Sequence, residues 1–253
     1  MRKRIGDHGQ MKSLILSLRS FTASLIHTVG NINFMDFRDK KQYHDHYELI
    51  SEHIDKYFGD VKINVFHEIP TLDIHLDVYH ISPADANYDV LLTSGMSSIA
   101  MNVTEIPEHS ESYKFAELMT MIPKGTAFGK IYPSNIKSDW ILSMLKQTAK
   151  FPHFYDTWIG VGHTIQAEAE LKPYSDQTKY CGCIVLPTMS FPEEFQTVKS
   201  KEGEINIYGL FPLYKEEIQF KIEHGYNEFV EFLIKNNTPE IIDFDRVNFC
   251  PGV

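Results

Sequence analysis

The sequence predicts an α/β fold of the α+β type, with a central, mostly mixed or antiparallel β-sheet packed with helices. Three observations carry this prediction. Residues 138–151 repeat apolar side chains every three to four positions, which is typical of a helix with one buried face. Residues 72–79 alternate apolar and polar side chains, which is the period of a strand. Residues 157–165 form an extended apolar segment that contains the run GVGH.

The composition is that of a globular protein. The chain has 253 residues, of which 43% are hydrophobic and 23% charged, and its net charge is −10. This charge argues against nucleic acid as a partner, because phosphate binding requires a basic surface. The sequence has no apolar run long enough to cross a membrane and no clean signal peptide. We therefore expect a cytoplasmic protein without a membrane partner.

The charge divides the chain into two parts. Residues 1–38 hold six basic and two acidic residues, and the remainder carries a balance of −14. Residues 1–38 also lack a clean hydrophobic period, so we predict a weakly ordered extension there. No linker, low-complexity run or internal repeat divides residues 42–250. We predict a single domain over residues 39–253.

The N-terminal half of this domain combines one helix with several strands. Tyrosine and isoleucine side chains recur at spacings of four and three over residues 42–58, and Gly59 supplies the left-handed residue that ends a helix. Residues 113–122 are apolar on both sides, so this strand is expected at the centre of the sheet. In addition to residues 72–79, the predicted strands of this half are 63–67, 88–93, 100–105 and 113–122.

The C-terminal half begins with the helix at residues 138–151. Ser138 is expected to cap its first N–H groups, and Pro152 is expected to end it, because the residue before proline avoids helical geometry. Pro212 is expected to open a second helix, which ends at Gly225. The remaining predicted elements are strands at 181–186 and 205–210 and an amphipathic helix at 226–234.

The three cysteines predict buried thiols. Cys181 and Cys183 point to the same side of a strand and have apolar neighbours, which favours burial over a disulfide and raises the thiol pKa. With only Cys250 left, a cysteine-based zinc site lacks ligands unless histidines join it.

His75, Asp77 and His80 form the cluster that most resembles a metal site. His75 and Asp77 share one face of a strand, whereas His80 points the other way unless a bulge intervenes. A catalytic zinc site normally needs three protein ligands, so we favour a polar row that faces solvent or a partner. A metal-dependent hydrolase that uses His75, Asp77 and His163 is the alternative interpretation.

The other candidate motifs have structural explanations. The GVGH run at residues 160–163 lacks the full phosphate-binding patterns and a following helix, so close backbone packing explains its glycines. The run SGMS at residues 94–97 departs from the nucleophile elbow G-x-S-x-G. Glu216 and Glu217 lie early in a helix, where carboxylates favour the dipole. We predict no catalytic residues, no cofactor and no metal.

Several stretches together resemble the Suppressor of fused (Sufu) domain in its bacterial form. The resemblance runs over residues 42–250 in the family's order, and no single motif carries it. Residues 1–38 lie outside it. The matching stretches are HLD (75–77), LTSGMS (92–97), AELM with IP (116–123), the segment from Trp140 to His153, TW (157–158), GHTI (162–165), IVLP (184–187) and YGLFPLYKEE (208–217), followed by Lys221, Glu223, His224 and Gly225.

The resemblance implies a single Sufu-like α/β domain that binds a protein and has no known chemistry. Bacterial relatives have been linked to toxin–immunity gene clusters. The implied function is therefore that of a non-enzymatic immunity protein that neutralises a cognate polymorphic toxin, or of a related cytoplasmic regulator. The oligomeric state stays open. The candidate partner-binding residues are Asp73, His75, Asp77, Ser94, Gly95, Met96, Ser97 and His163.

Overall fold

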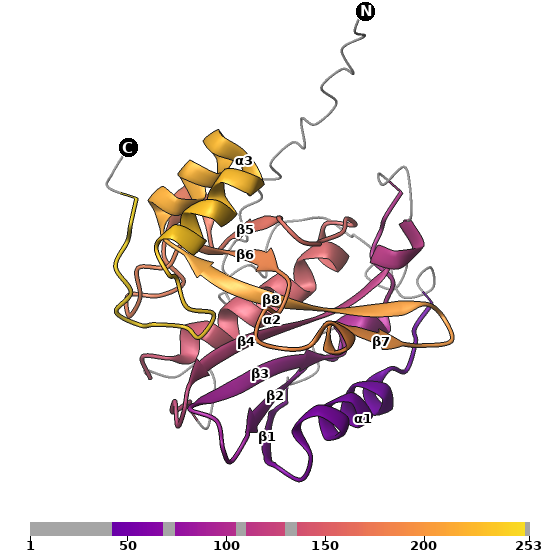
Figure 1. Cartoon of the computed structure of the whole chain (residues 1–253). Helices are drawn as coiled ribbons and strands as arrows, with labels where there is room; N and C mark the ends of the chain where they lie inside the picture. Colours follow the sequence, from indigo (N-terminus) through magenta and orange to yellow (C-terminus); the bar gives the residue numbers. More distant parts are fainter. Residues whose placement is uncertain (1–41, 68–73, 105–109, 130–135, 251–253) are drawn as a thin grey trace, which may run out of the picture.

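The computed structural model describes residues 42–67, 74–104, 110–129 and 136–250, so the predicted extension at residues 1–38 lies outside the described residues. Figure 1 shows the arrangement of the helices and strands. The helices are α1 (Tyr47–Phe58), α2 (Asp139–Phe154) and α3 (Lys215–Lys235). The strands are β1 (Lys62–Phe66), β2 (Asp77–Ser82), β3 (Tyr88–Ser94), β4 (Phe115–Pro123), β5 (Thr164–Gln166), β6 (Gly182–Leu186), β7 (Thr197–Lys199) and β8 (Glu204–Leu213).

The strands form one mixed sheet with the order β1-β2-β3-β4-β8-β6-β5, and β7 pairs with β8 beside this path. All pairings are antiparallel except that of β4 with β8, which is parallel. The predicted α+β class with a mixed sheet is therefore confirmed. β4 lies in the middle of the order, and eight of its nine residues are buried, as the apolar run at residues 113–122 predicts.

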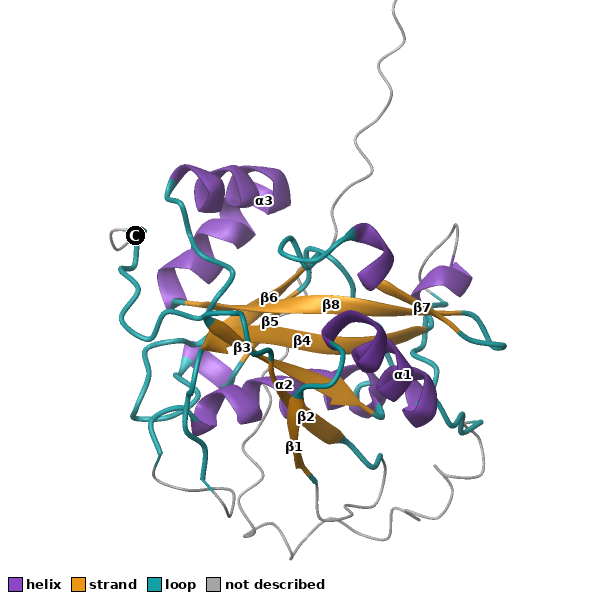
Figure 2. Ribbon diagram, turned by 60° about the horizontal axis from the view of Figure 1, so that its bottom comes forward, coloured by secondary structure: helices purple, strands orange, loops and turns teal. Residues whose placement is uncertain are grey.

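Alternating side chains of the central strands fill two cores on opposite faces of the sheet. On β3, Leu91 packs in the same core as α2, whereas Val90 and Leu92 pack in the core of α1. A third cluster joins α3 to β6 and the end of β8. Figure 2 shows the result, with α2 below the sheet and α3 above it. The sheet is thus covered on both faces.

α2 starts where the sequence predicts, with Ser138 at the N-cap position, but the expected side-chain cap and the expected end of the helix are wrong. Ser138 makes no side-chain cap, because its hydroxyl donates to the carbonyl of Ala127 instead. The helix also continues through Pro152 and ends at Phe154. Pro152 is buried in the last turn, where its missing N–H removes only one helical hydrogen bond. Packing of its ring therefore outweighs the local preference of proline.

The expected helix start at Pro212 is also wrong. Pro212 lies in β8, where it pairs with Cys183 of β6, and α3 begins at Lys215. Its carbonyl accepts a hydrogen bond from the side chain of Arg246, and the register of β8 with β4 is given by Ile205 to Gly209, before Pro212. Within a sheet, proline is tolerated where no neighbouring strand requires its N–H as a donor. The predicted break at Gly225 is confirmed, because this glycine has φ 85° inside α3.

Three predicted strands differ from the structure. The strand expected at residues 72–79 is shifted, because pairing with β3 begins at Asp77. The described part of residues 100–105 forms no strand. In the segment expected to be extended at residues 157–165, residues 157–160 have no regular secondary structure, residues 161 and 162 form a turn, and only the end joins the sheet as β5. Met101 and Val103 lie in the same core as α2, so these two side chains are buried by packing without strand pairing.

Candidate functional site

Glu117 on β4 is fully buried, and it holds the turn that follows β3. Its carboxylate accepts hydrogen bonds from the hydroxyl of Thr93 (2.7 Å), from the N–H of Gly95 (3.0 Å), and from the N–H (3.0 Å) and the hydroxyl (2.7 Å) of Ser97. Burial raises the pKa of Glu117, and the four donors oppose this shift. We call this arrangement the Glu117 turn, and it fixes residues 94–97 to the centre of the sheet.

Gly95 allows the Glu117 turn to approach the chain before β2. Its φ is 116°, which favours glycine, and a Cβ at this position would lie 2.2 Å from the carbonyl oxygen of His75. The hydroxyl of Tyr47 donates to the same carbonyl at 2.7 Å. The turn therefore lies directly behind the backbone of His75 and leaves no room for a larger residue.

The structure places the predicted contact residues of this turn inside the protein. Ser94, Gly95, Met96 and Ser97 are all buried. The carbonyl of Met96 lies 3.0 Å from Nε2 of His153, which connects the turn to the last part of α2. In this structure the side chains of the turn stabilise the fold and do not face solvent.

His75 and Asp77 lie together at the start of β2, and His67 joins them. His67 Nδ1 lies 3.1 Å and His75 Nε2 lies 3.2 Å from the same carboxylate oxygen of Asp77. The side chains of His67 and His75 are 71% and 42% exposed, whereas that of Asp77 is 9% exposed. We call these three residues the polar corner. Asp73, the remaining predicted contact residue of this segment, lies outside the described residues.

Two groups in the described part of the chain bring three metal-ligating side chains within reach of one another. One is the polar corner, and the other comprises His44, His46 and Glu202. His80 belongs to neither, because it points to the other face of β2 and pairs with Asp89 at 3.1 Å. This orientation of His80 is the one expected from strand alternation.

His163 lies just before β5, near the opposite edge of the sheet from the polar corner. Its ring centroid is 4.4 Å from that of Trp158, and burial, assisted by the charge of Lys221, lowers the pKa of His163 to about 4. Gly162 has φ 89°, and a Cβ there would lie 3.1 Å from the ring of Tyr226. The glycines of the GVGH run thus serve close packing, as predicted. Because β3, β4, β8 and β6 lie between β2 and β5, the three residues of the alternative hydrolase are not brought together.

A sequence comparison decides the family. The model of the Suppressor of fused protein (SUFU) family matches residues 73–247, well over half of the chain. The chain belongs to the Suppressor of fused family. The matched segment includes the Glu117 turn and two residues of the polar corner, and it excludes His67. No curated protein sequence matches the chain.

Two solved structures of this family are similar to the chain. The Sufu-Fu complex crystal structure has a TM-score of 0.53 and 12% sequence identity, and the match covers 83% of this chain and 93% of that chain. The crystal structure of Drosophila Suppressor of Fused has a TM-score of 0.48 and 10% identity, with coverage of 82% and 52%. At 12% identity, the likeness to the Sufu-Fu complex structure shows a shared fold. Among the described helices, none combines the length and apolar character that a membrane span requires.

Glu217 is a second fully buried carboxylate, and Arg246 neutralises it. The guanidinium donates to both carboxylate oxygens, at 2.5 and 2.7 Å, and to the carbonyl of Pro212 at 3.2 Å. Glu217 also accepts the N–H of Tyr214 at 2.9 Å at the start of α3. Burial lowers the pKa of Arg246, but the hydrogen bonds and charge of Glu217 outweigh it and raise this pKa. Glu217 therefore does more than favour the helix dipole, because it anchors α3 to the C-terminal segment.

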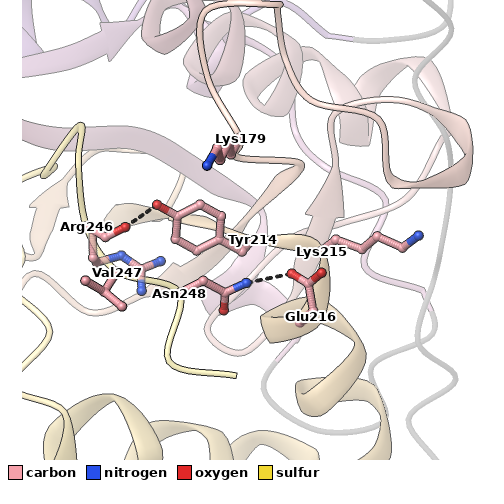
Figure 3. A pocket seen from close by; sticks show the side chains of 7 residues that line it. All are labelled: Lys179, Tyr214, Lys215, Glu216, Arg246, Val247 and Asn248. Carbon is pink, nitrogen blue, oxygen red and sulfur yellow. Dashed lines mark hydrogen bonds between the residues drawn. The ribbon is translucent and has the colours of Figure 1, made fainter. Parts of the chain in front are cut away.

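A hollow of about 400 Å³ adjoins this ion pair. Figure 3 shows the hydroxyl of Tyr214 donating to the carbonyl of Arg246, and the side chain of Asn248 donating to Glu216 at 2.6 Å. Since the guanidinium of Arg246 already binds Glu217, its charge is neutralised at the wall of the hollow. These contacts fasten the C-terminal segment to α3, and we assign them a structural role.

The sequence alone singles out two of these buried charged residues, Arg246 and Glu117. Arg246 is the only arginine after residue 38, and the planar guanidinium is the side chain best suited to a buried bidentate pair. Glu117 is the only charged residue in the apolar run of β4. A charge inside a two-sided apolar strand must find buried partners. Neither observation identifies the residues of this chain that bind Arg246 or Glu117.

The cysteine prediction agrees with the structure. Cys181, Cys183 and Cys250 are free and buried. Burial raises the pKa of Cys181 to about 11 and also raises that of Cys183. At neutral pH these thiols are protonated, which makes them poor nucleophiles and poor metal ligands.

Proposed function

We propose that this chain is a non-enzymatic protein-binding domain that acts in the cytoplasm as an immunity protein. In this proposal it neutralises a cognate polymorphic toxin by covering the toxin's functional surface. Membership of the Suppressor of fused family carries the proposal. One similar structure is described as a Sufu-Fu complex, which supports a protein as the class of partner.

The polar corner is the proposed contact surface. It exposes two imidazole rings beside one carboxylate, and the backbone behind them is fixed by the hydroxyl of Tyr47 and by the close approach of Gly95. Contact side chains on a fixed backbone lose less conformational entropy when they bind. Asp73 is proposed as a further contact in the same segment, and the Glu117 turn as its support. His163 stays a separate candidate near the other edge of the sheet.

The charge of the chain favours a basic partner surface. The net charge is −10, and residues 39–253 carry more negative charge than the whole chain. An acidic surface accelerates the encounter with a basic partner, and this acceleration falls as salt is added. The association rate with the partner should therefore decrease between low and physiological ionic strength.

Affinity capture from native cells with the full chain as bait tests the proposal. We expect one protein to be retained in an amount equal to that of the bait. This protein should be harmful to cells when it is expressed alone and harmless when it is expressed with this chain. Failure to retain a protein in equal amount, or a retained protein whose toxicity is unchanged by the chain, contradicts the immunity function.

The variant His75→Ala tests the contact surface, and His224→Ala is its matched control. The two imidazoles are 42% and 44% exposed, and each lies 3.2 Å from a carboxylate oxygen. Only His75 lies in the polar corner. We expect His75→Ala to reduce capture of the partner and His224→Ala to leave it unchanged. Equal capture by the two variants would remove the polar corner from the proposed contact surface.

A further inference from the structure

His44, His46 and Glu202 bring three candidate metal ligands together beside the start of α1. His44 Nδ1 lies 3.8 Å from one carboxylate oxygen of Glu202, and His46 Nε2 lies 3.3 Å from the other. One ligand atom from each residue lies within 4.8 Å of the others. Tetrahedral zinc with bonds of about 2.0–2.1 Å places its ligand atoms about 3.4 Å apart. The two distances from the imidazoles to Glu202 are close to this value.

The hydrogen bond at the other nitrogen of His46 determines which tautomer the ring adopts. His46 Nδ1 lies 3.0 Å from the carbonyl oxygen of Ser97. A carbonyl oxygen can only accept, so Nδ1 carries the proton, and in the neutral ring Nε2 holds a lone pair. This lone pair faces an oxygen of Glu202. Nε2 of His46 and the carboxylate of Glu202 are therefore two electron-pair donors that one metal ion can share.

The two imidazole rings are held by buried groups. The ring of Phe115 meets both edge-on, with centroids 5.3 Å from that of His44 and 5.2 Å from that of His46. Ser97, which orients His46, is itself bound to Glu117 through its N–H and its hydroxyl. A histidine that donates its second N–H to a backbone carbonyl is oriented as metal-binding histidines are. The Glu117 turn thus supplies the outer support of this cluster.

Glu202 is held by the tight turn between β7 and β8. Ser200 donates to the carbonyl of Gly203 through its N–H (2.9 Å) and its hydroxyl (2.7 Å), and the N–H of Glu202 donates to the hydroxyl of Ser200 at 3.1 Å. Gly203 has φ 143°, which favours glycine at this position of the turn. The side chain of Glu202 is 36% exposed, so a metal ion from solvent can reach its carboxylate without unfolding of the turn.

A hollow of about 460 Å³ adjoins the cluster, and His44 and Glu202 line it together with Lys114 and Phe115. Three protein ligands leave one position of a tetrahedral metal ion open. The hollow gives that position room for water or for a side chain of a partner. It also provides an entry path for the ion from solvent.

We propose that His44, His46 and Glu202 form a binding site for a divalent transition metal ion of the zinc class, with its open position toward the hollow. Two imidazoles and one carboxylate suit zinc and its neighbours in the first transition series. The polar corner has the same ligand types, but His67 is 71% exposed, whereas His46 is 3% exposed and bound from behind. The proposal does not depend on the immunity function or on the identity of the partner.

Zinc titration of the full, metal-stripped chain tests the site, followed by isothermal calorimetry and by metal analysis after removal of excess zinc. We expect one zinc ion per chain. The variant Glu202→Gln keeps the size of the side chain and removes its charge, and we expect zinc to bind at least about tenfold more weakly to it. The double variant His67→Gln/His75→Gln disables the polar corner and serves as the matched control, with zinc affinity unchanged.

A second readout separates a metal site from a simple ion pair of His46 with Glu202. Co²⁺ bound at a tetrahedral site absorbs strongly in the visible range, and we expect this absorption in the wild-type chain and in the polar-corner variant. Its loss in Glu202→Gln, with an unchanged far-ultraviolet circular dichroism spectrum, supports the site. Zinc affinity that is equal in the wild-type chain and in Glu202→Gln overturns the proposal, as does zinc that is lost only from the polar-corner variant.

Discussion

Glu117 and Glu217 are both completely buried, but the protein compensates their burial in different ways. Glu117 accepts hydrogen bonds from neutral donors of Thr93, Gly95 and Ser97, which follow one another in the chain. Glu217 instead forms an ion pair with one residue, Arg246, that lies 29 positions away. The first arrangement shapes a turn, and the second fastens the C-terminal segment to α3.

This difference determines how each region should respond to substitution. Removing one neutral donor from Glu117 leaves the other hydrogen bonds in place. Removing Arg246 leaves a buried carboxylate with its charge uncompensated, which is far less favourable than the loss of one hydrogen bond. The C-terminal anchor should therefore be the more sensitive of the two regions.

The largest effect is expected for Arg246→Met. Because Glu217 would remain buried without its cation, we expect the free energy of unfolding to fall by about 3–5 kcal/mol. Urea denaturation followed by circular dichroism measures this change. Lys215→Met is the matched control: it removes an exposed cation from the same hollow, and we expect a change within about 0.5 kcal/mol. A similar small change for Arg246→Met would contradict the role of the ion pair.

A smaller effect is expected for Glu117→Gln. The amide keeps one accepting oxygen but turns an NH₂ group toward the donors of the turn, so we expect a loss of about 2 kcal/mol in the free energy of unfolding. The same urea experiment measures it. Glu111→Gln is the control, because this glutamate is 77% exposed. The comparison between the two regions fails if Glu117→Gln destabilises the protein more than Arg246→Met does.

His163 extends the comparison to a group that stays uncharged. Its pKa is lowered to about 4 in the folded protein, from 6.5. Above pH 6.5 the ring is neutral in both states, so its contribution to stability is fully present there. As the pH falls toward 4, the unfolded chain takes up the proton first and this contribution is lost.

We therefore expect wild-type stability to fall by about 1 kcal/mol more than that of His163→Gln between pH 7.5 and 5.5. Urea midpoints at the two pH values measure this difference. His224→Gln removes an exposed histidine and should keep the wild-type pH dependence. Parallel pH profiles for the wild-type chain and His163→Gln would show that the pKa of His163 is the same in the folded and unfolded states, which contradicts this expectation.

The sequence predicts the parts of this fold that depend on local patterns. Period-two alternation and two-sided apolar runs identify most strands, including β4 at the centre, and Gly59 and Gly225 mark helix breaks correctly. Pro152 and Pro212 mislead because contacts with distant residues decide both positions: Pro152 is buried in the last turn of α2, and Pro212 lies in β8 with its carbonyl bound by Arg246. Tertiary packing, which the local pattern does not contain, decides these positions.

The candidate sites depend on contacts between distant residues, and the sequence predicts less of them. His75 and Asp77 are two residues apart, so strand alternation places them together. His46 and Glu202 are 156 residues apart, and contacts between distant segments, including the parallel pairing of β4 with β8, bring them near each other. The sequence interpretation places residues 94–97 at a contact surface, yet they are buried because Glu117 supplies an acceptor from another strand. The periodicity of the sequence does not predict such contacts between distant residues.

We propose that the Glu117 turn stabilises the domain while the polar corner contacts the partner. The most direct test compares Ser97→Ala with His75→Ala by the affinity of the folded protein for the captured partner, at a temperature where both variants are folded. We predict that Ser97→Ala lowers the free energy of unfolding by about 1–2 kcal/mol and keeps the wild-type affinity. We predict that His75→Ala changes stability by less than about 0.5 kcal/mol and weakens binding. Weaker binding by Ser97→Ala together with wild-type binding by His75→Ala would contradict the account.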